Sequence, residues 1–415
     1  MSRRMTAVDA QTYWMSAKVP NDQFLLFAFD GMPANVKRAV EELGSRAAAC
    51  DELRLRVQDD GALRYPRWVA GGIAPEQFVV RALDDDSWQG CLDAVARLAD
   101  EQLDLRRMAW RVHVFADVSD VPNIAVPAAV VVVQVSHALG DGRRSAALAG
   151  ALLGRGPSVQ AVTVQPTGSL VRRGVAAART HRQLVRGTEA GLLPPPGEPR
   201  PALSTNARPD GLRRVRTLIR HRTQLRGPTV TASVLAAVSD ALAGYLRDRG
   251  EDTTHLGAEV PIAKPSVPQA HNHFRNVSVS LHAELPRDQR YDAIVNELAG
   301  HRRRGEHPAM AAASRAFAAV PAPLLRWGVT QFDADVRSPT VTGNTVVSSV
   351  NRGAADLYFG EARVALTAGY PALSPLMSLT HGVHGIGDAI AISVHAAESA
   401  VDIDDYRDRL NAALS

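Results

Sequence analysis

The 415-residue sequence contains only two cysteines, Cys50 and Cys91. Two thiols are too few for a disulfide framework or a thiolate metal site, and their scarcity favours a reducing, cytoplasmic setting. The longest apolar run, 124–133, contains Pro127 and is far shorter than the roughly 20 residues that a transmembrane helix needs. The N-terminus has two arginines without an apolar run behind them, which argues against a secretory signal. A net charge of only +4 lacks the basic excess expected for nucleic-acid binding.

Helical and strand-like patterns alternate along the chain, which predicts a mixed α/β (α+β) fold in two halves. Helical patterns cover 36–49, 91–105, 231–249, 288–304 and 402–414. Strand patterns cover 110–115, 129–135, 214–219, 276–281, 341–350 and 389–395. The run 129–135 is rich in valine without alternation, which predicts a central strand covered on both faces. It leads into a polar turn at 136–142 and an Ala/Leu-rich helix that ends near Gly154.

The middle of the chain differs in composition from both halves. No acidic residue occurs between Arg155 and Glu189, and five prolines follow between 194 and 201, which indicates an extended linker. We therefore expect an N-terminal domain at 1–160, a basic and proline-rich crossover at 161–212, and a C-terminal domain at 213–415. The basic stretch fits either an anionic membrane surface or a solvent-facing crossover helix, and the sequence leaves both open.

The segment His137-Ala-Leu-Gly-Asp141-Gly142 is the sharpest candidate for chemistry. A histidine at the end of a buried strand is held by rigid elements, and neutral imidazole is well suited to accept a proton near neutral pH. Asp141 could clamp the turn through backbone amides or an arginine, and Gly142 would permit a backbone conformation closed to other residues. On spacing alone, a histidine that only completes the turn is the more frequent case.

The same segment resembles the HHxxxDG motif of an acyltransferase superfamily. That superfamily includes chloramphenicol acetyltransferase, peptide-synthetase condensation domains and the bacterial wax ester synthase/diacylglycerol acyltransferases. Stretches that resemble further motifs of the last group are Met108-Ala-Trp110, the helix at 229–250, Val260-Pro261, Asn272, the strand at 277–286, Ser348-Ser-Val-Asn-Arg-Gly353, Phe359-Gly360 and Tyr370-Pro-Ala-Leu-Ser-Pro375. The resemblance runs, with gaps, through nearly the whole chain. Departures are Ser136 for the first histidine, Thr231-Ala232 for Asn-Asp, and Ser349-Val-Asn351-Arg352 for Asn-Val-Pro-Gly.

The resemblance implies two chloramphenicol-acetyltransferase-like α/β domains with a channel between them, which the two substrates enter from opposite faces. It implies that His137 takes the proton of an acceptor hydroxyl, which attacks the thioester of an acyl-CoA. Acyl-CoA is then a co-substrate, and no cofactor is implied. Ser348 or Ser349 is the expected donor to the oxyanion, and Asp141 is expected to orient the loop. Asn272 fits either the channel lining or a strand-entry turn.

On this resemblance we expect an O-acyltransferase that esterifies a lipid alcohol, either diacylglycerol or a long-chain alcohol. The expected location is the cytoplasm, with peripheral attachment to a membrane or lipid-body surface as an option. One alternative keeps the fold but acylates a glycolipid or secondary-metabolite hydroxyl, or condenses a carrier-protein thioester. Another is a lipid- or acyl-CoA-binding relative without turnover, because Ser136, Thr231 and Ala232 replace the family's residues.

Other patterns point to no further chemistry. His271-Asn-His273 and His381-Gly-Val-His384 lack a carboxylate or thiolate at a familiar spacing, so we expect turn or surface histidines and no metal. Gly385-Ile-Gly387 lacks the third glycine of a dinucleotide fingerprint and is expected to form a turn. The sequence contains neither a G-x-S-x-G elbow nor a phosphate-binding P-loop. The basic run at 301–304 is expected to be a solvated helix end, with no nucleic-acid partner.

Overall fold

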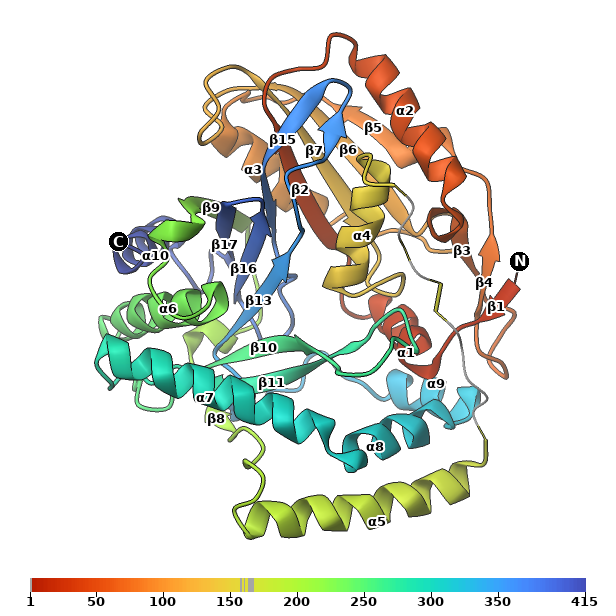
Figure 1. Cartoon of the computed structure of the whole chain (residues 1–415), viewed down its shortest axis with the longest axis vertical. Coiled ribbons are helices and arrows are strands. Elements are labelled where there is room, and N and C mark those ends of the chain that lie inside the picture. The colour runs from red at the N-terminus through yellow and green to blue at the C-terminus, as the bar shows by residue number, and fades with distance from the viewer. Residues whose placement is uncertain (1, 157–158, 160, 163–167) are drawn as a thin grey trace.

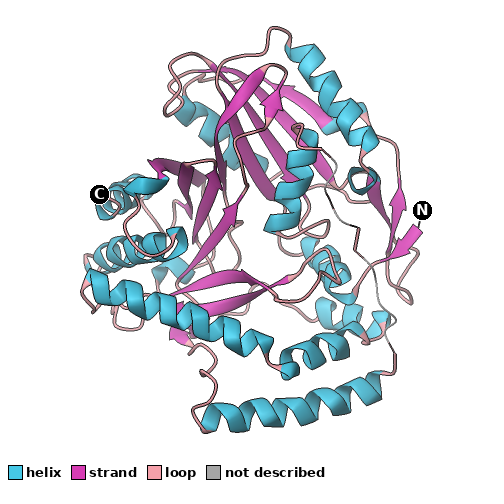
Figure 2. Cartoon of the chain, in the orientation of Figure 1, coloured by secondary structure: helices cyan, strands magenta, loops and turns pink. Residues whose placement is uncertain are grey.

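The computed structural model describes residues 2–156, 159, 161–162 and 168–415. Residue 160, where the N-terminal domain is predicted to end, and crossover residues 163–167 lie outside this part. Two six-stranded mixed sheets dominate the structure, with helices packed on their faces (Figures 1 and 2). The predicted mixed α/β class is confirmed. We call the two sheets with their covering helices the N-terminal and C-terminal lobes.

The sheet of the N-terminal lobe is built around the valine-rich strand. Its strands in spatial order are β14 (Tyr358–Phe359), β15 (Ala362–Gly369), β2 (Gln23–Phe29), β7 (Ala128–Val135), β6 (Trp110–Val118) and β5 (Phe78–Arg81). Every residue of β7 is buried, and β7 pairs antiparallel with both β2 and β6. A strand covered on both faces needs no polar alternation, so the predicted central position is confirmed.

Helices cover both faces of this sheet. One face packs against α1 (Ala7–Ser16), α2 (Val36–Ala49) and α4 (Gly142–Leu152), and the other against α3 (Trp88–Leu98). Helix α2 matches its predicted bounds and buries Ala39, Leu43 and Ala47, which are spaced by four residues along one stripe. Helix α3 ends at Leu98, seven residues before its predicted end, and the side chain of Gln102 donates to the carbonyl of the C-cap residue Ala99.

The C-terminal lobe has its own core. Its sheet runs in the order β11 (Phe274–Ser280), β10 (Gly257–Ala263), β13 (Thr345–Asn351), β16 (Leu379–Ile386), β17 (Ala389–Ala397) and β9 (Arg213–His221). Helices α6 (Val230–Arg247), α7 (Arg287–Glu306) and α10 (Ile403–Ala413) bury their apolar stripes against it. The predicted helices and most predicted strands of this half are confirmed within a few residues, whereas β10 and β16 were not predicted.

Two strands from the C-terminal half, β14 and β15, belong to the sheet of the N-terminal lobe. β15 follows the C-terminal strand β13 in sequence but pairs antiparallel with β2 of the N-terminal sheet, and it also packs against β16 and β17. Sheet membership therefore does not follow the predicted division at residue 213. Ser348 and Ser349 lie within β13, and His137 lies two residues after the end of β7.

The basic part of the crossover forms helix α5 (Leu170–Glu189), which packs along α8 (Pro308–Ala318) at the edge of the molecule (Figure 1). Smaller elements are α9 (Ala322–Thr330), which contacts α1, the sheet of β1 (Ser2–Arg4), β4 (Arg67–Ala70) and β3 (Leu55–Gln58), and the pair β8 (Arg200–Pro201) and β12 (Thr340–Val341). No helix in the described part of the chain has the length and apolar character needed to cross a bilayer.

Candidate active site

His137 lies in the turn between β7 and α4 and lines a cavity of about 420 Å³ at the seam of the lobes. We call it the His137 cavity. The N-terminal lobe contributes His137 and Gly142 to its wall, and the C-terminal lobe contributes Phe274, Ser348 and Ser349. An imidazole that is half-buried on rigid elements and open to a cavity has the placement that proton transfer requires.

The side chain of Asn272 determines which nitrogen of His137 carries the proton. The Asn272 Nδ2 amide donates to the His137 carbonyl at 2.7 Å and to Asp9 Oδ1 at 3.1 Å. Since only the NH₂ group can donate to these oxygens, Oδ1 is the atom that contacts His137 Nδ1, at 2.8 Å. Nδ1 therefore carries the hydrogen and donates it. In the neutral ring the lone pair is then on Nε2, which has no hydrogen-bond partner among the described residues.

Asp9, on α1, holds Asn272 in place from the N-terminal lobe. Its buried carboxylate accepts hydrogen bonds from the backbone amides of His271 and Asn272, from Asn272 Nδ2 and from the Thr6 hydroxyl. Burial raises the pKa of Asp9, and these hydrogen bonds oppose that rise. Sequence reasoning missed this residue. Thr6-Ala-Val-Asp9 has the spacing of a local helix cap, which hides the contact with a loop 263 residues away.

Asp141 links the turn that carries His137 to the loop that carries Asn272. It caps α4 by accepting from the Arg144 backbone amide at 3.0 Å, and its second oxygen accepts from the His273 amide at 2.9 Å. Asp141 therefore clamps the turn through backbone amides, which is one of the two modes predicted for it. Gly142 was predicted to adopt a backbone conformation closed to other residues, and this is wrong because its φ is not positive. A Cβ there would lie 3.0 Å from Val350 Cγ2, so Gly142 is needed for the close approach of β13.

Ser348 and Ser349 both line the His137 cavity from β13. Thr231, in the first turn of α6, donates its hydroxyl hydrogen to Ser349 Oγ at 3.0 Å. The hydrogen of Ser349 is then left to point elsewhere, which suits a donor to an oxyanion. Ser136, at the position of the motif's first histidine, is fully buried and does not line the cavity.

A second cavity, of about 530 Å³, does not include His137 in its lining but is lined by Asn272 and His273. Most of its charged side chains are basic: Arg4, Arg173, Lys264, Arg275 and Arg315, against the single acid Glu306. We call it the basic cavity. His137 therefore lines the His137 cavity, and its hydrogen-bond partner Asn272 lines the basic cavity.

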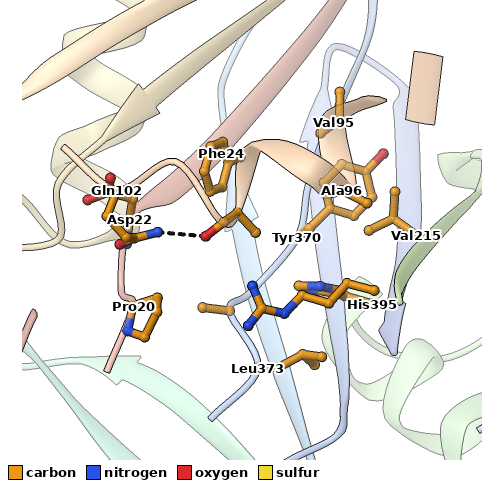
Figure 3. A pocket seen from close by; sticks show the side chains of 13 residues that line it. Pro20, Asp22, Phe24, Val95, Ala96, Gln102, Val215, Tyr370, Leu373 and His395 are labelled. Carbon is orange, nitrogen blue, oxygen red and sulfur yellow. Dashed lines mark hydrogen bonds between the residues drawn. The ribbon is translucent and has the colours of Figure 1, made fainter. Parts of the chain in front are cut away.

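A third cavity, of only about 20 Å³, lies between α3 and the strands β9 and β17 (Figure 3). It has room for about one water molecule. Asp22, Phe24 and Tyr370, which are labelled in Figure 3, line both this space and the His137 cavity. Burial raises the pKa of Asp22 to about 6, although the Leu103 amide and Gln134 donate to its carboxylate.

The prediction of turn or surface histidines is wrong for two of the four, His381 and His384, whereas His271 and His273 lie in the loop before β11. His381 and His384 are buried in β16, and His271 is buried and stacks on Trp68 with ring centroids 5.3 Å apart. His381 bonds the hydroxyls of Thr345 and Tyr406. Within the described ranges, no three His, Cys, Asp or Glu side chains come together as a metal site would require. Gly387 forms the expected turn, with φ of 55° between β16 and β17.

No protein-family model matches the chain, and no curated protein matches its sequence. A solved structure, the wax ester synthase/diacylglycerol acyltransferase from Marinobacter aquaeolei VT8, superposes with a TM-score of 0.64 at 18% identity, covering 99% of this chain and 98% of that one. The chain has the fold of that acyltransferase.

Two condensation-domain structures also match the full chain. One is a mutant starter condensation domain of rhizomide synthetase in complex with C8-CoA and Leu-SNAC, with a TM-score of 0.60 at 14% identity, covering 93% of that domain. The other is the first condensation domain of the CDA synthetase, with a TM-score of 0.59 at 13% identity, covering 94% of that domain. The likeness to these structures is therefore one of fold, and it covers nearly the whole chain.

Proposed function

We propose that this protein transfers an acyl group from a thioester to a hydroxyl bound in the His137 cavity. The observation that carries the proposal is the contact between His137 Nδ1 and Asn272 Oδ1. In the neutral ring this contact puts the lone pair on Nε2, and the ring lines the cavity. The matching fold supports acyl transfer as the reaction class.

In the proposed mechanism Nε2 takes the proton of the acceptor hydroxyl while its oxygen attacks the thioester carbonyl. Ser349 donates its free hydrogen to the oxyanion of the tetrahedral intermediate. The intermediate collapses by breaking the C–S bond, and the leaving thiolate takes the proton from the imidazolium. Positioned proton transfer contributes about 10²–10⁴-fold to such a rate, and an oxyanion donor about 10²–10³-fold.

The basic cavity is the proposed site of the donor, an acyl-CoA. Its arginines and Lys264 suit the phosphates of CoA, and it reaches Asn272 beside the reacting centre. A condensation domain of the same fold has been solved with C8-CoA bound. A carrier-protein thioester is the competing donor, and parallel assays with both donors would separate them. No cofactor beyond the thioester enters the proposal.

For the acceptor, a lipid alcohol such as diacylglycerol or a long-chain alcohol remains the first candidate. A more polar hydroxyl, as in a glycolipid or secondary metabolite, is the second candidate, and one observation favours it. Five of the residues that line the His137 cavity carry a charge: Asp22, Asp141, Arg143, Glu259 and Arg352. Polar hydroxyl compounds can form hydrogen bonds with such side chains, which an apolar chain cannot.

The test replaces His137 with Ala and follows ester formation from radiolabelled octanoyl-CoA with an acceptor panel that includes dioleoylglycerol, hexadecanol and a glycolipid. We expect turnover to fall at least about 10²-fold in a folded variant. Unchanged turnover would refute the role of His137. Stoichiometric binding of acyl-CoA by the wild type without any product would instead support a binding protein that lacks turnover.

The proposed location is the cytoplasm, with α5 as a peripheral membrane contact. The outer face of α5 exposes Val171, Val175 and Val185 beside four arginines: Arg172, Arg179, Arg182 and Arg186. None of these four arginines forms an ion pair with a carboxylate in the part of the chain that the structure describes. Binding to vesicles with 30% anionic lipid that is lost at about 0.5 M salt would support this contact.

A further inference from the structure

Arg352 lies just after β13, where the resembling family has a glycine, and it lines the His137 cavity. Its side chain reaches the gap between the two sheets. The Nη1 group donates to the Ala368 carbonyl at 2.9 Å, to the Leu26 carbonyl at 3.3 Å and to the Thr367 hydroxyl. Its Nε is buried without a hydrogen-bond partner among the described residues. Only 5% of the residue is exposed.

This buried cation has no counter-charge in the described ranges of the chain. Three acids line the same cavity, and each is bonded elsewhere: Asp22 to Leu103 and Gln134, Asp141 to Arg144 and His273, and Glu259 to Asn276 and Thr342. Burial lowers the pKa of Arg352 to about 9, so the guanidinium is still charged at neutral pH. Proteins rarely bury a charge unless something pairs with it.

His384, on β16, lies beside Arg352 in the same cavity. A Cβ at Gly369 would lie 2.8 Å from Arg352 Nη2 and 3.0 Å from His384 Nε2, so both side chains converge where only glycine leaves space. His384 Nδ1 is also buried without a partner in the described residues. Burial and the nearby guanidinium lower the pKa of His384, which keeps the ring neutral and able to donate one hydrogen.

We infer that Arg352 and His384 form a subsite for the carboxylate of a substrate in the His137 cavity. A single guanidinium balances a single negative charge, and its fork matches the two oxygens of a carboxylate. A phosphate monoester carries about two negative charges and would remain half uncompensated there. The inference deepens the proposed function, since the carboxylate belongs either to the acceptor alcohol or to the far end of the acyl group.

The experiment compares matched substrates that differ only in the carboxylate. One arm offers 6-hydroxyhexanoate or 1-hexanol as acceptor with octanoyl-CoA. The other offers glutaryl-CoA or pentanoyl-CoA as donor with 1-hexanol. We expect the wild type to prefer the carboxylate-bearing member by about 30-fold in kcat/KM in one arm, which identifies the source of the carboxylate. Equal kcat/KM values within both arms would overturn the subsite.

The variant Arg352→Met keeps the length of the side chain without its charge and should abolish the preference. Arg337→Gln, which changes an exposed arginine on a loop outside the cavity, is the matched control and should keep it. If Arg352→Met fails to fold, Arg352→Lys keeps the charge but not the fork and should reduce the preference about 5- to 10-fold. A full preference in either folded variant would contradict the assignment.

Calorimetric titration with hexanoate separates this inference from the proposed reaction. Hexanoate binding that weakens about 30-fold in Arg352→Met, in a protein without turnover on any substrate, would support the subsite and refute the transferase. If the protein instead transferred the acyl group to 1-hexanol but bound hexanoate and hexanol equally well, the transferase would be supported and the subsite refuted. Each result therefore decides one of the two claims independently of the other.

Discussion

Replacing Asn272 tests whether the hydrogen bond to Nδ1 governs the reactivity of His137. In Asn272→Ala the imidazole loses its 2.8 Å partner, so the hydrogen can move to Nε2 and the ring can rotate. Asp9 keeps its bonds to the backbone amides of residues 271 and 272, which limits the structural damage. Since partners that orient a catalytic histidine are worth about 10- to 100-fold, we expect kcat/KM to fall by up to about 10², or about 2.7 kcal/mol of barrier.

Asn272→Asp keeps an acceptor for His137 Nδ1 but replaces the donating Nδ2 group by a carboxylate oxygen. The carboxylate can still accept from Nδ1 but cannot donate to the His137 carbonyl, and it faces Asp9 Oδ1 across the present 3.1 Å contact. Two carboxylates this close share a proton, so we expect the variant to be more stable at pH 5 than at pH 8. Initial rates and urea midpoints over this pH range would measure both effects.

Asn411→Ala, which changes an exposed residue on α10, is the control and should leave kcat/KM unchanged. The reasoning would be refuted if folded Asn272→Ala stayed within about threefold of the wild type. In that case the imidazole would not depend on a fixed tautomer, and the contact would serve only to join the lobes.

Further predictions concern the oxyanion donor, the pH dependence of stability and the packing of β13. Ser349→Ala should lower kcat about 10²-fold with little change in KM, measured by initial rates. The folded-state pKa of Asp22, about 6 against 3.8 in the unfolded chain, means that stability falls as pH rises from about 4 to 6, by about 3 kcal/mol. Asp22→Asn should remove this loss in urea titrations. The pKa of His113, lowered by burial to about 4 from 6.5, has the opposite sign, because its stabilising effect is lost as pH falls from 6.5 to 4. His113→Gln should flatten that acid limb of the urea midpoints. Gly142→Ala should push Val350 away and slow turnover about tenfold, and adding Val350→Ala should restore it, which steady-state rates would show.

Features that depend on local sequence could be predicted. Helix α2 has one apolar stripe between clear ends, and β7 has a valine run that needs cover on both faces, so each was predicted within one residue at either end. The turn after β7 and the candidate base His137 followed from the same local order. These elements satisfy their own backbone groups or show their burial directly in the residue pattern.

Features that depend on distant partners could not be predicted. The sequence of β16 contains two histidines and two glycines and looks like a turn, yet it is a buried strand because Thr345 and Tyr406 satisfy the ring of His381. Asp9 looks like part of a helix cap, and its contact with Asn272 exists only once both lobes are folded. No periodicity within one segment carries that information.

The chain of contacts through Asp9 shows why both lobes are needed for one base. The ring of His137 comes from the N-terminal lobe, the amide that sets its tautomer comes from the C-terminal lobe, and the carboxylate that holds that amide comes from the N-terminal lobe again. A small displacement of one lobe would lengthen the 2.8 Å contact and free the ring at the same time. Because a misplacement of about 1 Å can cost about 10²-fold in rate, proton transfer here depends on how the lobes are packed as much as on the histidine itself.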